Sequence, residues 1–228
     1  MHNQSTPPGP TPGPAIWLVR HGQSTWNIAG LAQGHDDTAE LTELGLTQAE
    51  EAAREFRGRP VRAIYASDLR RALQTAAAFA LVLERPVFAD ARLRERSLGV
   101  LEGLPTSAIG PSATGLEAGR VANPAARPAG GESVRDLYRR AAEFIDELAA
   151  TIDDEAGDVL VVAHGGTVRV LEAYLRGIPA DQMAWGPVEN AAMVCIPGFR
   201  ARLRGFPPLR SVSPVPQELL NHSQGGNR

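Results

Sequence analysis

The sequence contains no lysine, so all 23 of its basic residues are arginine. This excludes a Schiff-base lysine and a P-loop lysine, and any phosphate chemistry must use arginine, histidine or backbone groups. The one cysteine, Cys195, cannot form an internal disulfide, which fits a reducing compartment. No apolar run approaches the roughly 18 residues of a membrane span, and residues 1–14 lack the apolar core of a secretory signal. We therefore expect a cytoplasmic protein with no membrane partner.

A surplus of basic charge is also missing. The 26 acidic and 23 basic residues give a net charge of −3, so we expect no nucleic-acid partner. A length of 228 residues with 43% hydrophobic content predicts a single core. Residues 1–14 and 206–228 are rich in Pro, Gly and small polar residues, so the sequence predicts two disordered tails around one domain at 15–205.

Between these tails, apolar runs of strand length alternate with stretches of helical period, which indicates an α/β sheet. We expect strands at 15–20, 61–67, 159–165 and 191–196, with a further edge strand at 200–206. One helix is predicted to begin after an N-cap at Ser67 and to stop before Pro86, and another to begin at Ser133 with Asp136 completing a capping box. Two more helices are predicted at 43–57 and 166–176.

Residues 104–129 have little periodicity and contain many Gly, Pro, Ala and Ser residues. This composition predicts a loosely ordered excursion from the domain. Either a lid insertion over a site or a passive surface loop fits such a segment.

Polar side chains follow two of the predicted buried strands. Arg20 and His21 come directly after the apolar run 16–19, and His164 with Gly165 comes directly after 158–163. In open α/β sheets, ligands bind at the carboxyl ends of the strands. The glycines and the following helical patterns bring backbone N–H groups to the same edge, which favours an anion.

Two histidines in matching contexts indicate chemistry more strongly than one would. A neutral imidazole can attack phosphorus, and arginine supplies fixed, planar cationic donors for the oxygens of a phosphoryl group.

Five segments, in this order, give the sequence a family resemblance: "LVRHGQSTWN" (18–27), "SDLRRALQTA" (67–76), "LRERSLGVLEG" (93–103), "GGES" (130–133) and "VVAHGG" (161–166). Together they resemble the signatures of the histidine phosphatase superfamily, which also includes cofactor-dependent phosphoglycerate mutases. The resemblance implies a phosphoglycerate mutase-like fold, a three-layer α/β/α sandwich with a mostly parallel central sheet.

The resemblance also implies roles for individual residues. It implies that His21 is the nucleophile that becomes phosphohistidine and that Glu95 protonates the leaving oxygen and then activates water. The resemblance makes His164 a further catalytic residue and assigns the phosphoryl oxygens to Arg20, Asn27, Arg71 and Gly165. Arg71 matches the family pattern better than Arg70, although the sequence leaves the pair slightly ambiguous. His35 could contact substrate or be a surface residue.

The function expected is a phosphomonoester hydrolase that acts on a small phosphorylated metabolite with no metal and no other cofactor. A phosphoglycerate mutase is the first alternative, but mutases of this family grip the substrate carboxylate with Lys and paired Arg. Residues 104–129 offer only Arg120 and Arg127. A non-catalytic phospho-ligand binding protein is the second alternative. The sequence does not identify the substrate, and it leaves the oligomeric state open, a homodimer included.

Overall fold

The central sheet has five strands in the order β3-β2-β6-β1-β8. The computed structural model describes residues 14–151, 157–199, 214–216 and 220. Four strands run parallel, and β8 pairs antiparallel with β1 at one edge. The strands are β1 (Ile16–Arg20), β2 (Val61–Ala66), β3 (Val87–Ala89), β6 (Asp158–Ala163) and β8 (Met193–Ile196).

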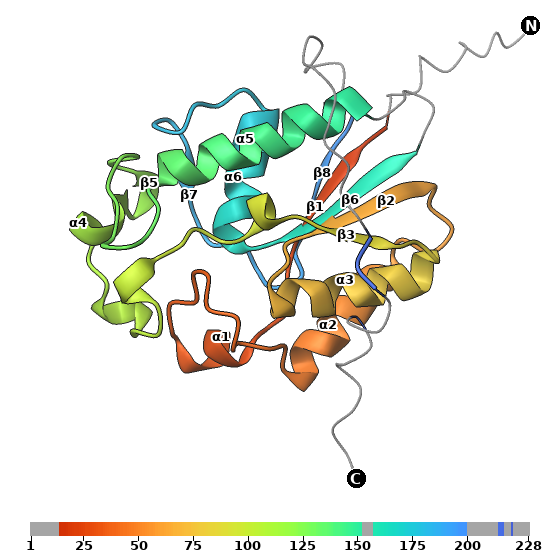
Figure 1. Cartoon of the computed structure of the whole chain (residues 1–228), viewed down its shortest axis with the longest axis horizontal. Helices are drawn as coiled ribbons and strands as arrows, with labels where there is room; N and C mark the ends of the chain where they lie inside the picture. Colours follow the sequence, from red (N-terminus) through yellow and green to blue (C-terminus); the bar gives the residue numbers. More distant parts are fainter. Residues whose placement is uncertain (1–13, 152–156, 200–213, 217–219, 221–228) are drawn as a thin grey trace, which may run out of the picture.

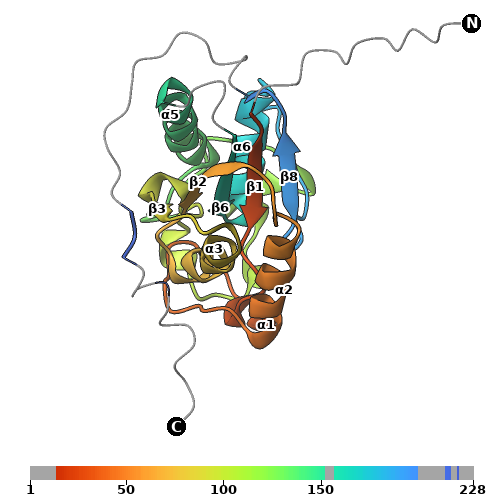
Figure 2. The same cartoon turned by 90° about the vertical axis from the view of Figure 1, so that its right-hand side faces the viewer.

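Helices cover both faces of this sheet and make the three layers visible in Figures 1 and 2. Successive strand side chains point to opposite faces, so each face buries its own set of residues. Ile16, Leu18 and Val161 pack on α5 (Val134–Thr151) and α6 (Gly165–Leu175). Val19, Ile64 and Val162 pack on the other side, beneath α2 (Glu43–Arg54) and α3 (Arg70–Leu83). The predicted α/β/α sandwich with a mostly parallel sheet is confirmed.

The register of the two central strands places the two histidines side by side. β1 and β6 pair in parallel with Arg20 opposite Ala163, so the next residues, His21 and His164, leave the sheet at the same level. The backbone N–H of His21 donates to the carbonyl of Ala163 at 2.9 Å, which extends the pairing by one step.

Helix α5 begins as the sequence predicts. Ser133 and Asp136 form the reciprocal capping box, with Ser133 N–H donating to Asp136 Oδ2 at 2.9 Å and Asp136 N–H donating to Ser133 Oγ at 3.1 Å. The prediction of Ser67 as the N-cap of α3 is wrong, because the helix begins at Arg70 with Leu69 in the cap position. Ser67 instead contacts His164, described below.

Residues 104–129 contain short regular elements: a 3₁₀ turn at Thr106–Ala108, α4 (Pro111–Thr114), β4 (Leu116–Glu117) and β5 (Gly119–Val121). Strand β5 pairs with both β4 and β7 (Ala184–Trp185), which makes a small antiparallel sheet beside the main domain. The segment is therefore more ordered than its composition predicted, because pairing with the distant β7 supplies backbone hydrogen bonds that local periodicity does not reveal.

The predicted N-terminal tail and edge strand at 200–206 lie outside the described residues, apart from Pro14. Within 206–228, the described residues contact the fold: Val215 N–H donates to the carbonyl of Val87 at 2.7 Å, and Leu220 is buried in the α2–α3 core. The expectation of a tail outside the core does not hold at these positions, because β3 is an edge strand with open backbone groups. Among the described residues, no helix is long and apolar enough to span a membrane.

Candidate active site

His21 and His164 lie at the carboxyl end of the sheet with their ring centroids 5.2 Å apart and their ring planes at 62°. Both side chains are almost fully buried. His21 follows β1 directly, and His164 is the N-cap residue of α6. The chain thus brings two imidazoles, from positions 143 residues apart, into one small volume.

The hydrogen bond of His21 determines which ring nitrogen is available. Nδ1 lies 2.7 Å from the carbonyl oxygen of Gly22. A carbonyl can only accept, so Nδ1 carries the hydrogen and Nε2 of the neutral ring keeps its lone pair. Burial, followed by the charges of Arg71 and Arg20, holds the pKa of His21 well below its ordinary value, although the Gly22 carbonyl opposes this. His21 is therefore a neutral imidazole with a free Nε2.

His164 is positioned by a hydrogen bond with Ser67. Its Nε2 lies 2.8 Å from Ser67 Oγ, while its buried Nδ1 has no hydrogen-bond partner in the described part of the chain. Burial and the nearby charge of Arg71 lower the pKa of His164 well below its ordinary value. Nδ1 is therefore left to contact an incoming group.

Two arginines face these histidines. Arg71, fully buried in the first turn of α3, donates to the carbonyls of Asp36 at 2.7 Å and Gly34 at 2.9 Å. Arg20 donates to the carbonyl of Val188. The Nε atoms of both arginines are buried without a partner among the described residues. Buried donors in such a state are stabilised by an anion that supplies the missing acceptors.

Arg70, the alternative to Arg71, lies on the surface, where its Nη1 is 3.5 Å from Glu40 Oε2. It does not line the cavity, whereas Arg71 does. The first turn of α3 explains this, because consecutive helix residues point about 100° apart and only one of the pair can face the core.

Asn27 lies in α1 (Thr25–Ala29) and is fixed through its side-chain oxygen. Oδ1 accepts from Ser24 N–H at 3.0 Å and from Asn190 Nδ2 at 3.1 Å. The Asn27 amide nitrogen remains as a donor at the cavity surface.

Glu95 follows the 3₁₀ turn Ala91–Leu93 and carries the one carboxylate among the described residues that line the cavity. Its Oε2 accepts from Gly166 N–H at 2.8 Å, and its Oε1 accepts from Arg96 N–H at 2.8 Å. A Cβ atom at Gly166 would stand 2.3 Å from Oε1, so this approach requires glycine. Burial lowers the pKa of Arg20 and of Arg71, and the nearby Glu95 charge opposes this shift.

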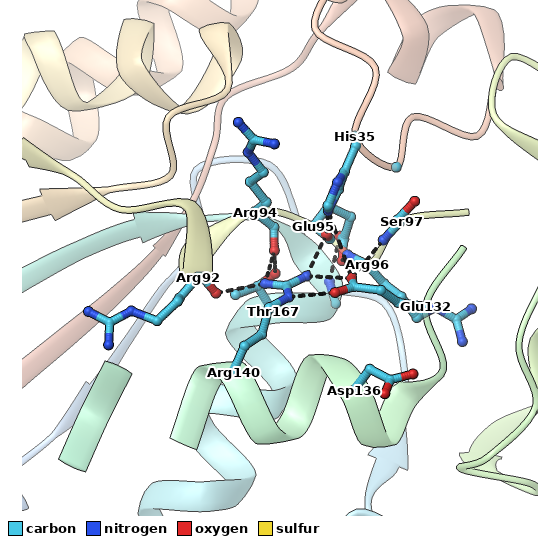
Figure 3. Close-up of polar contacts among 12 residues, drawn as sticks. His35, Arg92, Arg94, Glu95, Arg96, Ser97, Glu132, Asp136, Arg140 and Thr167 are labelled. Carbon is cyan, nitrogen blue, oxygen red and sulfur yellow. Dashed lines mark hydrogen bonds and ion pairs between the residues drawn. The ribbon is translucent and has the colours of Figure 1, made fainter. Parts of the chain in front are cut away.

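The backbone around Glu95 is held by Arg140 of α5, as Figure 3 shows. Arg140 donates to the carbonyls of Arg92, Arg94 and Glu95 at 2.6, 2.7 and 2.7 Å and pairs with Glu132 Oε2 at 2.8 Å. Burial alone would raise the pKa of Glu132, but the hydrogen bonds and charge of Arg140 lower it below its ordinary value.

His35 approaches this segment from the opposite side and lies outside the cavity lining. Its Nε2 is 2.7 Å from the carbonyl of Glu95 and 3.8 Å from Glu132 Oε2. It is thus neither a substrate-facing residue in this structure nor a free surface residue, and it helps to fix the Glu95 backbone.

The structure places all seven predicted site residues in the lining of one cavity of about 490 Å³: Arg20, His21, Asn27, Arg71, Glu95, His164 and Gly165. Polar groups gather at the end of the sheet. The lining also includes apolar residues, three of them from residues 104–129: Leu31, Leu98, Ile109, Pro111 and Leu116.

Three charged or aromatic lining residues were missed by the sequence analysis: Arg96, Arg169 and Trp185. Arg96 stands in an arginine-rich run that resembles a surface segment. Arg169 had a usable signal, because it interrupts the apolar helix residues Val168, Val170 and Leu171 four positions after Gly165. The sequence contains no comparable signal for Trp185, because its two-residue strand depends on pairing with β5.

A neutral imidazole with a free nitrogen, a positively charged cradle and a carboxylate can carry out phosphoryl transfer to histidine. Over residues 14–151, 157–199, 214–216 and 220, no group of three or more His, Cys, Asp or Glu side chains could hold a metal ion. Metal-independent chemistry stays a prediction that a chelator can test.

Comparison with known proteins agrees with this chemistry. The family model of the histidine phosphatase superfamily, branch 1, matches residues 16–202. Glucosyl-3-phosphoglycerate phosphatase of Mycobacterium tuberculosis is 36% identical over 200 residues, which cover 85% of this chain and 89% of that protein. Probable phosphoglycerate mutase GpmB of Yersinia pestis is 36% identical over 174 residues, 72% of this chain and 76% of that one.

A solved structure of a mycobacterial glucosyl-3-phosphoglycerate phosphatase in complex with VO3 superposes with a TM-score of 0.70 and 35% sequence identity. The match covers 80% of this chain and 90% of the other. The likeness therefore extends over the sheet, its helices and the site.

Proposed function

The chain belongs to the histidine phosphatase superfamily, branch 1, and from that premise we propose that it hydrolyses small phosphomonoesters through a phosphohistidine at His21. The observation that carries the proposal is the free Nε2 of a neutral His21 in a cavity that also holds Arg20, Arg71 and Glu95. No metal or other cofactor takes part in the proposed reaction.

Binding comes first. The phosphoryl oxygens accept hydrogen bonds from Arg20, Arg71, the Asn27 amide and His164, and the N–H of Gly165 at the start of α6 adds a further donor. Support comes from the buried, unpartnered Nε atoms of both arginines and the unpartnered Nδ1 of His164. The cavity thus holds fixed donors for a tetrahedral anion.

Transfer then takes place in two steps. Nε2 of His21 forms a bond to phosphorus while the bond from phosphorus to the leaving oxygen breaks, and Glu95 gives its proton to that oxygen. Glu95, now a carboxylate, takes a proton from water as the water oxygen bonds to phosphorus and the N–P bond breaks. Inorganic phosphate leaves, and both His21 and Glu95 return to their starting states.

The mutase alternative requires retention of the phosphohistidine, and the mutase pattern places the cations for the substrate carboxylate in segment 104–129. Of the two cations in 104–129, Arg120 pairs with Glu117, and Arg127 pairs with Asp136 at 2.6 Å. Neither lines the cavity. A non-catalytic binding protein would have no need for His21, Glu95 and His164 together. Both observations favour a hydrolase.

Segment 104–129 is proposed as the lid over the substrate, because Thr106, Ile109 and Thr114 line the cavity. The compounds in the relatives' names, glucosyl-3-phosphoglycerate and phosphoglycerate, are the first substrates to screen. A cytoplasmic location and a homodimer stay predictions of the sequence.

The deciding experiment measures phosphate release from p-nitrophenyl phosphate with EDTA present, for the wild-type protein and His21→Ala. We expect release that EDTA does not reduce and that His21→Ala abolishes. Quenching with an alkaline denaturant during turnover should give a protein heavier by one phosphoryl group that acid, but not alkali, dephosphorylates. Full activity in His21→Ala would overturn the proposal, and isomerisation of 3-phosphoglycerate with little phosphate release would favour a mutase.

A further inference from the structure

More positive charge lines the cavity than a phosphoryl group needs. Among the described lining residues, four are arginines and one, Glu95, is an acid. Arg20 and Arg71 are assigned above to the phosphoryl oxygens. Arg96 and Arg169 then remain as two further guanidinium groups in a partly dehydrated space, where uncompensated charge is costly.

Arg169 lies one helical turn beyond Gly165 and therefore faces the same side of α6. A Cβ atom on Gly165 would stand 3.5 Å from Arg20 Nε and 3.7 Å from Arg169 Nη1. Two like-charged side chains thus border the same glycine. Arg169 continues the positive lining outward from the phosphoryl cradle.

The ring of Trp185 contacts both Arg169 and Arg96. The Cζ atom of Arg169 is 5.0 Å from the centroid of the Trp185 ring, and the Cζ atom of Arg96 is 5.9 Å from the same ring. Cation–π contacts of this kind orient a guanidinium group without neutralising it. Both arginines keep their charge available to a ligand.

Two nearby arginines with structural roles are each paired with a carboxylate. Arg92 pairs with Asp90 at 2.6 Å, and Arg94 pairs with Asp68 at 2.6 Å. In the described part of the chain, Arg169 has no carboxylate partner, and its buried Nε has no acceptor. The almost fully buried Arg96 donates to one acceptor, the carbonyl of Thr114, at 2.8 Å.

Burial lowers the pKa of Arg169, and the adjacent Arg20 lowers it further, while Glu95 opposes both effects. The charge of Arg169 is thus only partly compensated by the described residues that line the cavity. An anion beside Trp185 would relieve this repulsion and satisfy the buried donor.

We propose that Arg169, together with Arg96 beside Trp185, forms a subsite for a carboxylate on the leaving group, so that the preferred substrates are phosphorylated hydroxy acids. The inference rests on the proposed function, because it places the phosphoryl group on Arg20 and Arg71.

A carboxylate fits this position better than a second phosphoryl group. The planar guanidinium fork matches the two oxygens of a carboxylate, which need only a few donors. Besides the four arginines, the described residues that line the cavity include no Arg or Lys to neutralise a dianion, and Leu98, Ile109 and Leu116 make part of the lining apolar. The same apolar part can accept the carbon skeleton of the leaving group.

The test compares substrates that differ only at the carboxylate. D-3-phosphoglycerate is paired with sn-glycerol 1-phosphate, which has the same configuration at C2, and O-phosphoserine with O-phosphoethanolamine, and kcat/KM for phosphate release is measured for each. Hydrogen bonds to a charged group predict a preference for the acid of about 30-fold. In Arg169→Gln, this ratio should fall to about 3 or less, with Arg169→Lys in between because it keeps the charge but not the fork.

Arg120→Gln is the matched control, because it removes one exposed arginine from the small sheet and not from the cavity lining. It should keep the wild-type ratio. Equal kcat/KM for acid and alcohol in the wild-type protein would overturn the inference, as would an Arg169→Gln variant that loses activity equally on all four substrates. p-Nitrophenyl phosphate, which has no carboxylate, tests the proposed function separately. If the wild-type protein releases no His21-dependent phosphate even from this substrate, the proposed function itself fails.

Discussion

Gly166 N–H donates a hydrogen bond to Glu95 Oε2 at 2.8 Å, which joins the acid of the site to the first turn of α6. His164 caps the same helix. The N-terminus of a helix favours a carboxylate, so one backbone segment orients both a histidine and the acid. The position of Glu95 consequently depends on the absence of a side chain at residue 166.

Gly166→Ala should lower catalytic activity much more than it lowers the free energy of unfolding. The new Cβ would stand 2.3 Å from Glu95 Oε1 and 3.1 Å from its Cδ, so the carboxylate must move. Displacing the general acid should lower kcat/KM for an alkyl phosphate about 100-fold. The free energy of unfolding should change little, because alanine in a helix offsets the clash by up to about 1 kcal/mol. Steady-state kinetics and thermal unfolding check both expectations.

Gly186→Ala is the control, since a Cβ there meets no atom within 4 Å. Its kinetics should match those of the wild-type protein. If Gly166→Ala keeps full activity on alkyl phosphates, Glu95 does not act from the position that the structure shows.

Glu95→Gln should separate substrates by the quality of their leaving group. An alkoxide needs a proton to depart and p-nitrophenolate does not, so the loss in kcat should be about 1000-fold for an alkyl phosphate and much smaller for p-nitrophenyl phosphate. Glu143→Gln, an exposed carboxyl of α5, serves as the control. Equal losses on the two substrates would contradict the role of Glu95 as a proton donor.

The sheet and the histidines were predictable because their signals are local. An apolar run followed by a charged residue, as at Val19 and Arg20, shows where a buried strand ends, and the parallel register then brings His21 and His164 together. The capping box of Ser133 and Asp136 is likewise contained in four residues.

Features that depend on distant partners could not be read in this way. Ser67 resembles an N-cap, but its tertiary contact with His164 prevails over the local preference. Trp185 belongs to a strand of two residues that exists through pairing with β5. Arg96 differs from Arg92 and Arg94 in its deeper burial and in having no carboxylate partner in the described structure, and sequence alone shows neither feature.

Arg140→Met should destabilise the protein, because three backbone carbonyls and Glu132 lose their common donor. A partly buried carboxylate left without its partner costs about 3 kcal/mol, or roughly 10 °C in Tm for a domain of this size. The adjacent Arg139→Met is the control: Arg139 is exposed, and among the described residues its ion pairs are with Asp136 at 3.6 Å and Glu143 at 4.0 Å, so about 0.5 kcal/mol or less is expected. Chemical denaturation of both variants tests the difference, and equal effects would refute the role of Arg140.

The two buried histidines should make the protein less stable as the pH falls below 6.5. Burial, the largest cause, and nearby arginines lower the folded-state pKa of His21 and His164 well below 6.5, whereas the unfolded chain titrates near that value. Below pH 6.5 the unfolded state therefore binds more protons than the folded state, and the free energy of unfolding decreases by up to about 1.4 kcal/mol per pH unit for each histidine. Above pH 7 this contribution is constant.

Urea denaturation at pH 8, 7, 6 and 5.5, in buffers without phosphate, measures this slope. His164→Gln should reduce it by about half, because one of the two depressed pKa values is removed. A free energy of unfolding that is independent of pH between 7 and 5.5 would show that His21 and His164 are protonated as readily in the folded chain as in the unfolded one. Neither imidazole would then be held neutral by the fold, and the nucleophile would lack the free Nε2 from which the mechanism begins.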